Sequence, residues 1–434
     1  MLIEFKYSNF RSFREEAVLS MEATGLSTFK NSLITYRTTK LLPTVAIYGK
    51  NGGGKSNVIR AFWLAAQFIR SAQRTQHEKA TIPVKPFLLD DKSTEVPTSF
   101  EFTYVLDEVK YTYGFAATKT CVTKEYLYHA PKGQKSMVFD REYQNFTFRE
   151  NQEKKKRQLI SEAVAPNQLY FAVACTMNEK ACTAAMRWFR DYLFFSRDYT
   201  DIPHQLLEYA EDANMLKAIS NYAKSADLGI RDMQFEVKST ELDDSKNLPS
   251  NIPDGIKSAL ATFMQALSEA PNTAETKLMM GEVNATSFHK GIGADGQEKL
   301  YPLKLSDESD GTRKLMALAP GIERVLACGG VLLVDELEKE LHPTLVAMIV
   351  SKFQSKRTNP NNAQLIFTTH NLELLNMELI RKDQLYFTDK SRKNGASILY
   401  SISDFATPTS ENVRKGYLMG KYGATPDVEI EEVD

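Results

Sequence analysis

The segment from Tyr48 to Ile59, YGKNGGGKSNVI, restricts the fold of this chain more than any other feature of the sequence. It fits the pattern G-x-x-x-x-G-K-[ST] and follows the apolar run LPTVAIYG at residues 42–49, which predicts a buried strand. Residues 56–69 then carry apolar side chains at helical spacing. A strand, a glycine-rich loop and a helix in this order are typical of a loop that binds phosphate groups.

The chemistry of this loop follows from its residue types. Glycines let successive backbone N–H groups point at phosphate oxygens, because no Cβ blocks the approach, and the helix N-terminus adds partial positive charge. Lys55 is predicted to reach the β- and γ-phosphates, and the Ser56 hydroxyl to coordinate Mg²⁺. We therefore expect ATP and Mg²⁺ as cofactors, with the following residues at the nucleotide: Asn51, Gly52, Gly53, Gly54, Lys55, Ser56 and Asn57.

A second apolar run, Val331 to Val334, ends in the adjacent acids Asp335 and Glu336. In P-loop proteins, a buried strand that ends in Asp places a ligand on Mg²⁺ or its waters. Two adjacent acids alone can also mark a strand end that meets solvent. Beside a phosphate loop, we expect Asp335 to be a metal ligand in the catalytic site and Glu336 to polarise a water towards the γ-phosphate. A glutamate in this place suits a hydrolase better than a kinase.

A third apolar run, IFTTHN at residues 366–371, ends in polar residues that include His370. A lone histidine here could serve only a core hydrogen bond. At the carboxyl edge of a neighbouring parallel strand, it would instead lie beside the bound γ-phosphate. We expect His370 to read the γ-phosphate or the attacking water. Three short apolar strands with helices between them predict a parallel sheet and an α/β fold.

Composition narrows the class of protein. Lys and Arg number 54 and Asp and Glu 55, so the whole chain has no charge bias towards constitutive nucleic-acid binding. The four cysteines have no paired metal spacing, and we expect buried free thiols. No segment approaches 18 consecutive apolar residues, and the charged N-terminus does not fit a signal peptide. We expect a cytoplasmic protein without membrane contact.

The pattern along the chain predicts three parts. Residues 1–150 carry the phosphate loop and antiparallel strands, including a hairpin over 98–116. Residues 151–295 read as a largely helical insertion, with helical periodicity at 177–195, 202–226 and 255–270, and with a charged, solvated start at 151–159. Residues 296–434 return to α/β character, and their first helix, 312–327, is expected to bend or break at Pro320-Gly321.

The stretch LSDESDGTRKLMAL, residues 305–318, allows two interpretations. Ser309, Asp310 and Gly311 could simply cap the helix that begins near Thr312. The same residues could also grip an anion, because a hydroxyl, a close backbone N–H and a helix dipole meet there. Asp310 should then face away or cap the helix, and Glu308 needs a cationic or N–H partner.

The order of these motifs resembles the ABC-type ATPase heads of the RecF/SMC/OLD group. The resemblance rests on the loop G-x-N-G-x-G-K-S, the Ser-x-Gly turn, VLLVDELEKELHP and TTHN. It implies a P-loop head with a mixed sheet, a parallel core sheet and a mainly helical insertion. It also implies that Ser309 and Gly311 cap the γ-phosphate held by a second subunit, in a homodimer with ATP-sandwich sites.

A narrower resemblance is carried by NFRSF at residues 9–13, ESDGTRKL, DELEKELHP and YLMGKYGATP. These segments are similar to the AAA-15 or abortive-infection ATPases, the family of RloA-like and PARIS-type anti-phage proteins. The resemblance implies that Arg11 contacts the nucleotide and that His342 lies in the loop that crosses the dimer interface. No glutamine is a convincing link between Mg²⁺ and the helical lobe; Gln67, Gln73 and Gln76 are weak candidates.

These features together predict an ATPase that acts as sensor and scaffold of a bacterial anti-phage system. Its partner would be a separate effector, a nuclease or toxin, because the chain has no nuclease motif of its own; a phage protein is a candidate trigger, and oligomers above the dimer stay open. The alternative is a RecF/SMC-like DNA-repair ATPase that binds DNA, for which KKKR at residues 154–157 is the sole sequence hint. A third possibility, a non-catalytic ATP-gated module, is disfavoured by Glu336.

Overall fold

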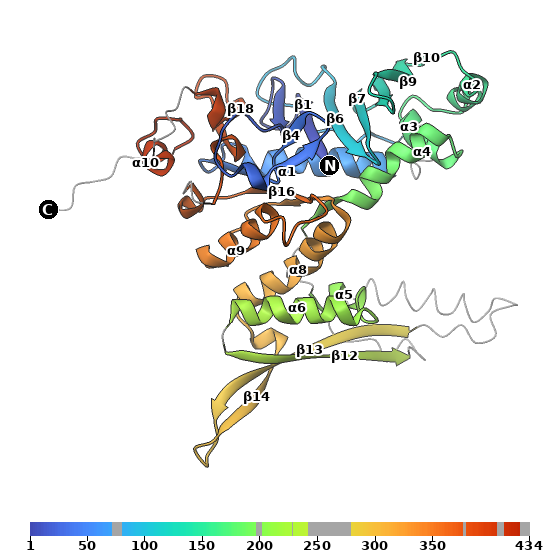
Figure 1. The fold of residues 1–434 in the computed structure, drawn as a ribbon. Helices are drawn as coiled ribbons and strands as arrows, with labels where there is room; N and C mark the ends of the chain where they lie inside the picture. The colour runs from blue at the N-terminus through green and yellow to red at the C-terminus, as the bar shows by residue number, and fades with distance from the viewer. Residues whose placement is uncertain are drawn as a thin grey trace, which may run out of the picture. The chain divides into compact units, whose positions relative to one another are not determined.

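The computed structural model describes residues 1–71, 80–196, 202–227, 229–241, 279–375, 379–405 and 412–425. The chain forms two compact units (Figure 1). The first unit comprises Met1–Ser196 and Gly321–Asp434, and the second comprises Arg197–Pro320. No helix in the described part of the chain is long and apolar enough to cross a membrane.

The first unit contains a seven-stranded sheet that is antiparallel throughout, in the order β10-β9-β8-β7-β6-β1-β2. Its strands are β1 (Leu2–Ser8), β2 (Ala17–Ser20), β6 (Thr98–Leu106), β7 (Val109–Ala117), β8 (Val122–Ala130), β9 (Ser136–Glu142) and β10 (Asn145–Phe148). The hairpin expected over 98–116 is confirmed: β6 and β7 pair around Asp107 and Glu108. These two residues have φ of 48° and 59°, as a tight two-residue hairpin turn requires.

The second sheet of this unit has six strands in the order β11-β15-β16-β5-β17-β18. They are β5 (Thr44–Gly49), β11 (Leu193–Phe195), β15 (Val331–Val334), β16 (Gln364–Thr368), β17 (Leu385–Lys390) and β18 (Ser397–Ser401). Only β18 runs antiparallel to its neighbour. Every residue of β5, β15 and β16 is buried. The predicted α/β fold, with antiparallel strands beside a parallel core sheet, is confirmed.

Helix α1 (Lys55–Ser71) packs against both sheets and joins their cores (Figure 1). The Phe62 ring lies 3.7 Å from the Phe5 ring of β1 and 6.0 Å from the Phe102 ring of β6, between centroids. Other residues of α1 contact β5 and β16. This packing fixes the start of α1, and therefore the phosphate loop, against the antiparallel sheet.

The rest of the first unit consists of short elements around these sheets. They are β3 (Ile34–Tyr36), β4 (Thr39–Leu41), α2 (Lys154–Glu162), α3 (Tyr170–Thr176), α4 (Lys180–Arg187), α9 (Pro343–Gln354) and α10 (Val413–Leu418). The helix predicted over 177–195 is wrong at its end, because residues 193–195 form β11, parallel to β15. Leu193 is buried there, so burial in the sheet core decides the outcome over helical periodicity.

The charged segment 151–159 is not simply solvated. Arg157 is buried, and its guanidinium lies 2.8 Å from a carboxylate oxygen of the buried Glu179 and donates to the carbonyl of Val138 at 3.1 Å. Lys154 pairs with Glu150, and Lys156 donates to the carbonyl of Asn178. The KKKR run is therefore largely engaged within the protein, and it loses its value as a sign of DNA binding.

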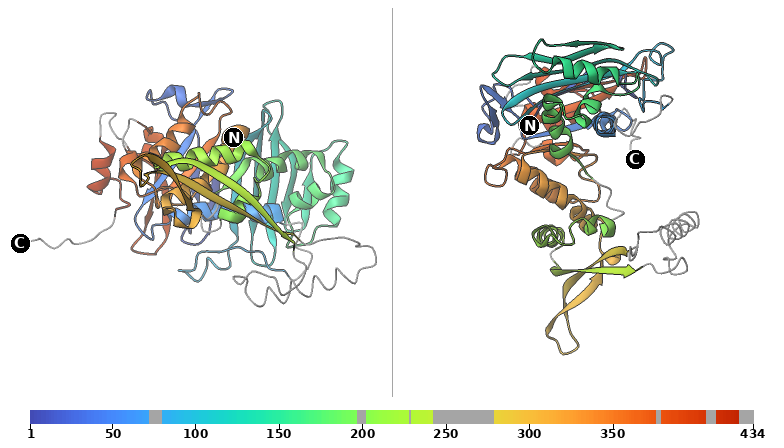
Figure 2. Two further views of the ribbon diagram at one scale, coloured as in Figure 1. Left: turned by 90° about the horizontal axis from the view of Figure 1, so that it is seen from below. Right: turned by 90° about the vertical axis from the view of Figure 1, so that its right-hand side faces the viewer.

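The second unit contains α5 (Ile202–Leu207), α6 (Ala213–Ala226) and a three-stranded antiparallel sheet in the order β12-β13-β14. The strands are β12 (Ile230–Glu241), β13 (Met279–Ile292) and β14 (Glu298–Lys304), and the sequence analysis predicted none of them. Helix α6 packs along β12 and α5 against β13 (Figure 2). The helix predicted at 255–270 lies outside the described residues.

Helix α8 (Asp310–Cys328) begins in the second unit and continues into the first. Helix α8 does not break at Pro320-Gly321, because it continues through both residues. Pro320 has no backbone N–H to donate within the helix. The division between the two units falls at this proline.

One buried side chain fastens the two sheets of the first unit together. Gln364, at the start of β16, accepts from the backbone N–H of Leu2 at 2.6 Å and donates to the carbonyl of Leu2 at 3.0 Å and to that of Leu42 at 3.2 Å. We predict that Gln364→Leu lowers the free energy of unfolding by about 2–4 kcal/mol, because it leaves buried backbone groups unpaired. Urea unfolding measures this; the exposed Gln158→Leu serves as control and should change little.

Candidate active site

The phosphate loop lies between the end of β5 and the start of α1. A Cβ at Gly54 would lie 2.9 Å from the Ser397 hydroxyl and 3.1 Å from the Phe13 ring, and its φ of +116° is strained for other residues. A Cβ at Gly49 would lie 2.4 Å from Oγ1 of Thr388. Both glycines of the sequence pattern are thus required by the close approach of neighbouring strands and side chains.

Lys55 is buried at the first position of α1, and its ammonium group lies over the loop. Its Nζ donates to the carbonyls of Gly49 at 2.8 Å and Lys50 at 3.2 Å. Burial lowers the pKa of Lys55, and the carboxylates of Glu338, Glu336 and Asp335 act in the opposite direction. The lysine therefore shares one electrostatic environment with the acids that follow β15.

The remaining loop residues divide by exposure. Asn51 and Gly52 are exposed, Gly53 is buried, and Ser56 is half-buried at the start of α1. The Asn57 side-chain amide donates to the Ser12 hydroxyl at 2.9 Å. Through this bond the first turn of α1 is tied to the NFRSF segment.

Within that segment, Asn9, Phe10 and Phe13 are buried, and Arg11 is exposed with φ of 50°. Burial lowers the pKa of Arg11, and the nearby charge of Arg60 on α1 lowers it further. Arg11 therefore lies close to the exposed side of α1. Its contact with the nucleotide stays a prediction.

Asp335 and Glu336 follow β15 directly, and Thr368 at the end of β16 binds both. The Thr368 hydroxyl donates to Oδ1 of Asp335 at 2.6 Å and accepts from the backbone N–H of Glu336 at 2.7 Å. Glu336 has φ of 50° and an exposed side chain, while Asp335 is half-buried. One threonine therefore orients the predicted metal ligand and the backbone of the predicted base together.

His370 lies next to the same carboxylates. Its backbone N–H donates to Oε1 of Glu338, while Oε2 of Glu338 is buried and has no hydrogen-bond partner among the described residues. Burial lowers the pKa of His370, and the charge of Lys55 lowers it further against the opposing carboxylates of Glu338 and Glu336. The imidazole is therefore held neutral at neutral pH, able both to donate and to accept a hydrogen bond.

Ser309 and Gly311 belong to the second unit, where they form the start of α8. The Ser309 hydroxyl accepts from the backbone N–H of Thr312 at 3.1 Å, so it caps the helix. Asp310 pairs with Arg313, and the Ser309 side chain is exposed. Capping and gripping of an anion are compatible here, because an exposed hydroxyl at a helix start can still accept or donate outward.

The sequence of this chain matches one protein family over most of its length. A family model described as "AAA domain, putative AbiEii toxin, Type IV TA system" matches residues 45–376, more than half of the chain. The chain belongs to this AAA-domain family. Family membership, together with the phosphate loop, makes it an ATP-binding ATPase of the P-loop type. The narrower resemblance to the AAA-15 or abortive-infection ATPases stays a prediction.

Solved structures similar to this chain include SMC head domains and the recombination mediator RecF. The AAA-domain protein is 14% identical to the SMC head domain from Thermotoga maritima, with a TM-score of 0.36, covering 92% of this chain and 98% of that one. It is 12% identical to an SMC head bound to the C-winged helix domain of ScpA, with a TM-score of 0.41 and coverage of 92% and 97%. For the recombination mediator RecF of the RecFOR pathway, the identity is 12%, the TM-score 0.35 and the coverage 92% and 98%.

No curated protein matches the sequence of this AAA-domain protein. Its fold assignment rests on its own sheets and phosphate loop, since the structural similarities lie below a TM-score of 0.5.

Two site residues of the AAA-domain protein were missed by sequence reasoning, Thr368 and Glu338. Thr368 lies in the apolar run IFTTHN. Its position next to the acids that follow β15 depends on the pairing register between β15 and β16, which the sequence does not show. Glu338 is one of several acids in DELEKELHP, and no spacing rule sets it apart.

Other expected residues have different outcomes. His342 caps α9, since its Nδ1 accepts from the backbone N–H of Thr344 at 3.3 Å, and its place at a dimer interface stays a prediction. Among the weak glutamine candidates, Gln67 lies within α1, whereas Gln73 and Gln76 lie outside the described residues.

We predict that Thr368→Val weakens Mg²⁺-dependent ATP binding by about ten- to a hundredfold, because Asp335 loses the hydrogen bond that orients it. Titration of a fluorescent ATP analogue at several Mg²⁺ concentrations measures the effect. Thr103→Val, which removes a buried hydroxyl in the antiparallel sheet, is the control and should bind normally. Equal affinity for both variants would contradict the role given to Thr368.

Proposed function

We propose that this AAA-domain protein hydrolyses ATP in ABC-type composite sites, each formed by two copies of the chain. The observation that carries the proposal is the gathering of Lys55, Asp335, Glu336 and His370 at one edge of the parallel sheet, linked by electrostatic interaction and by Thr368. A phosphate-binding lysine, an acid at the end of the next strand but one, a second acid and a neutral histidine are the groups that ATP hydrolysis needs.

The oxygen ligands present fit Mg²⁺. The Ser56 hydroxyl and the Asp335 carboxylate are hard donors, and Mg²⁺ binds proteins through one or two such groups together with phosphate oxygens. When bound, the ion would neutralise charge that develops on the β- and γ-phosphates. Ser56 at the helix start and Asp335 at the strand end would hold it, and Lys55 would bind the same phosphates.

Glu336 is the proposed general base. Its side chain is exposed at the strand end, and its position next to Asp335 would place a water between it and the γ-phosphate. His370 would bind the γ-phosphate or that water through its neutral imidazole. Glu338 would act as a positioning residue, because it holds the His370 backbone and leaves one buried oxygen for a donor that arrives with the nucleotide.

Ser309 and Gly311 would close the site of the second copy. The exposed Ser309 hydroxyl and the N-terminal end of α8 would form the binding surface for the anion. ATP would then hold two heads together, and hydrolysis would release them. The two-state clamp gives the protein its conformational signal.

The biological role we propose is that of sensor and scaffold in a bacterial anti-phage system, with a separate nuclease or toxin as effector. Support comes from the AAA-domain family, whose description names a toxin and a toxin–antitoxin system, and from the resemblance of the sequence motifs. The alternative role in DNA repair is not favoured by an observation, since Lys154, Lys156 and Arg157 of the KKKR run have their side chains engaged within the protein.

We predict that Glu336→Gln reduces ATP turnover by about a hundredfold or more and leaves ATP binding intact, because the base is lost while the phosphate ligands stay. With ATP and Mg²⁺, the variant should accumulate as an ATP-bound dimer, which light scattering after gel filtration measures. Glu340→Gln, a nearby exposed acid, is the control. Wild-type turnover in Glu336→Gln would remove Glu336 from the base role.

The composite site itself predicts complementation between two inactive variants. Lys55→Ala and Ser309→Arg should each abolish turnover alone. Mixed in equal amounts, they should recover about a quarter of the wild-type rate, because about half of the dimers are mixed and each mixed dimer has one intact site of two. A mixture as inactive as its two components would contradict a site formed by two copies of the chain. Loss of ATP binding by monomeric Ser309→Arg would instead indicate that Ser309 acts on the nucleotide bound by its own chain.

The anti-phage role is tested in cells. The gene together with its neighbouring gene should reduce phage plating, and Lys55→Ala should abolish that protection. The trapped Glu336→Gln protein should co-purify with the neighbouring gene product. Protection that persists with Lys55→Ala, or repair proteins in place of an effector, would overturn this role without affecting the ATPase assignment.

A further inference from the structure

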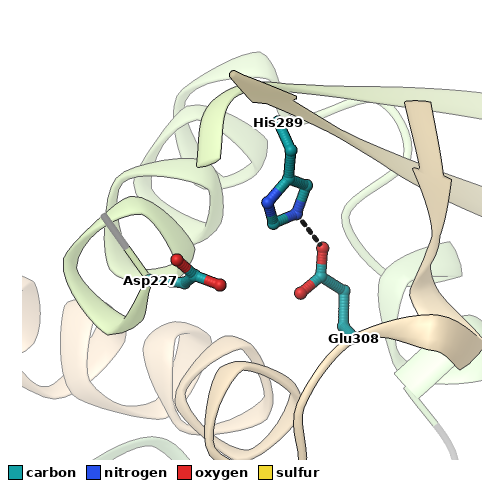
Figure 3. A group of neighbouring side chains, drawn as sticks. All are labelled: Asp227, His289 and Glu308. Carbon is teal, nitrogen blue, oxygen red and sulfur yellow. Dashed lines mark hydrogen bonds and ion pairs between the residues drawn. The ribbon is translucent and has the colours of Figure 1, made fainter. Parts of the chain in front are cut away.

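Three side chains with metal-binding chemistry meet within the second unit: Asp227, His289 and Glu308 (Figure 3). One ligand atom of each, a carboxylate oxygen or an imidazole nitrogen, lies within 4.8 Å of the other two. Nε2 of His289 lies 2.7 Å from Oε1 of Glu308. The ATPase site does not use any of the three.

The fold brings these residues together from distant parts of the sequence. Asp227 caps the C-terminal end of α6, His289 lies in β13, and Glu308 directly precedes Ser309 at the start of α8. In Figure 3 the three side chains point towards one common space. Each is held by its own element, so the cluster does not depend on a single loop.

Further contacts orient the ligand groups. The Ser287 hydroxyl on β13 donates to Oε1 of Glu308, and the backbone N–H of Gly229 donates to Oδ1 of Asp227 at 2.7 Å. A Cβ at Gly229 would lie 3.0 Å from Nδ1 of His289 and 3.1 Å from Oδ1 of Asp227. A glycine at this position therefore keeps a side chain away from both ligand groups.

The charge of the cluster calls for a cation. The Glu308 side chain is only 2% exposed, that of His289 is 18% exposed, and both carboxylates lie within 4.8 Å of one imidazole. Two carboxylates so close repel each other unless positive charge lies between them, and the cost rises with burial. Among the described residues, no lysine or arginine forms an ion pair with Asp227 or Glu308.

We propose that Asp227, His289 and Glu308 bind one divalent transition-metal ion of the Zn²⁺ or Co²⁺ type. One imidazole nitrogen and two carboxylate oxygens are three of the ligands that such ions use, and they leave one position for water. Around a tetrahedral ion bound at about 2.0–2.2 Å, the ligand atoms lie about 3.3–3.6 Å apart. The His289 and Glu308 atoms, now 2.7 Å apart, would have to open, and Asp227 would adjust from its place within 4.8 Å of both. Ser287 supports Glu308 from outside the ligand set, as outer hydrogen bonds commonly do.

An ion bound at this position would affect the start of α8. Glu308 is covalently joined to Ser309, so a bound ion would fix the backbone at the start of α8. Any effect on ATP turnover rests on the proposed role of Ser309, but binding of the ion does not.

Metal titration of the full chain tests the site. After treatment with chelator and its removal, calorimetry with Zn²⁺ should find one ion per chain, and Co²⁺ should give visible absorption bands of a low-coordinate complex. His289→Gln and Asp227→Asn should weaken Zn²⁺ binding by more than about a hundredfold, and Ser287→Ala by about tenfold.

Matched controls separate this site from others. Asp295→Asn removes a carboxylate that accepts from the N–H two residues on, as Asp227 does, and it should leave binding unchanged. His342→Gln and Lys55→Ala should also bind Zn²⁺ normally, so failure of the ATPase assignment is distinguishable. Thermal unfolding without metal checks that each variant folds.

Two results would overturn the proposal. One is Zn²⁺ binding of equal affinity in His289→Gln. The other is a wild-type protein that shows no Co²⁺ absorption bands.

Discussion

The parallel register of β5, β16 and β15 is the constraint on which the rest of the site depends. Val334 pairs with Phe367, and Thr368 with Ile47, so the three strands end within a few residues of one another at the same edge of the sheet. The segments that follow them carry Lys55, the acids Asp335 and Glu336, and His370. Side chains alternate between the two faces of a sheet along each strand. A one-residue shift in the pairing of β16 with β15 would therefore turn Thr368 away from Asp335, and the hydrogen bond between them would be lost.

The site concentrates charge that must be balanced locally. Three carboxylates act on Lys55, and the buried oxygen of Glu338 has no hydrogen-bond partner among the described residues. Buried polar groups are usually satisfied, so such an oxygen marks a place where a ligand or ordered water can contribute a donor. The same logic applies in the second unit, where Glu308 is buried beside His289 and lies close to a second carboxylate. In each cluster, a bound cation would supply charge that compensates the carboxylates.

Most of the head fold could be predicted from the sequence, because its signals are local. The apolar runs 42–49, 331–334 and 366–371 and the hairpin 98–116 are short patterns of burial and turn, and all appear as expected. The three strands of the second unit could not, since β14 is exposed along its whole length and carries no alternating pattern of burial. Residues 193–195 form a strand because they pair with β15, and the helical periodicity of the sequence does not reveal that pairing.

The sequence by itself determined the phosphate loop, its lysine and the acids that follow an apolar strand, because a nucleotide site of this type needs fixed residue types at fixed spacing. Only the tertiary structure decided that Thr368 binds both Asp335 and the backbone of Glu336, that Glu338 holds His370, and that Glu308 finds its partner in His289. These contacts join residues that lie 19 to 33 positions apart. Strand register and the packing of separate elements set such distances, and neither is written in any local pattern.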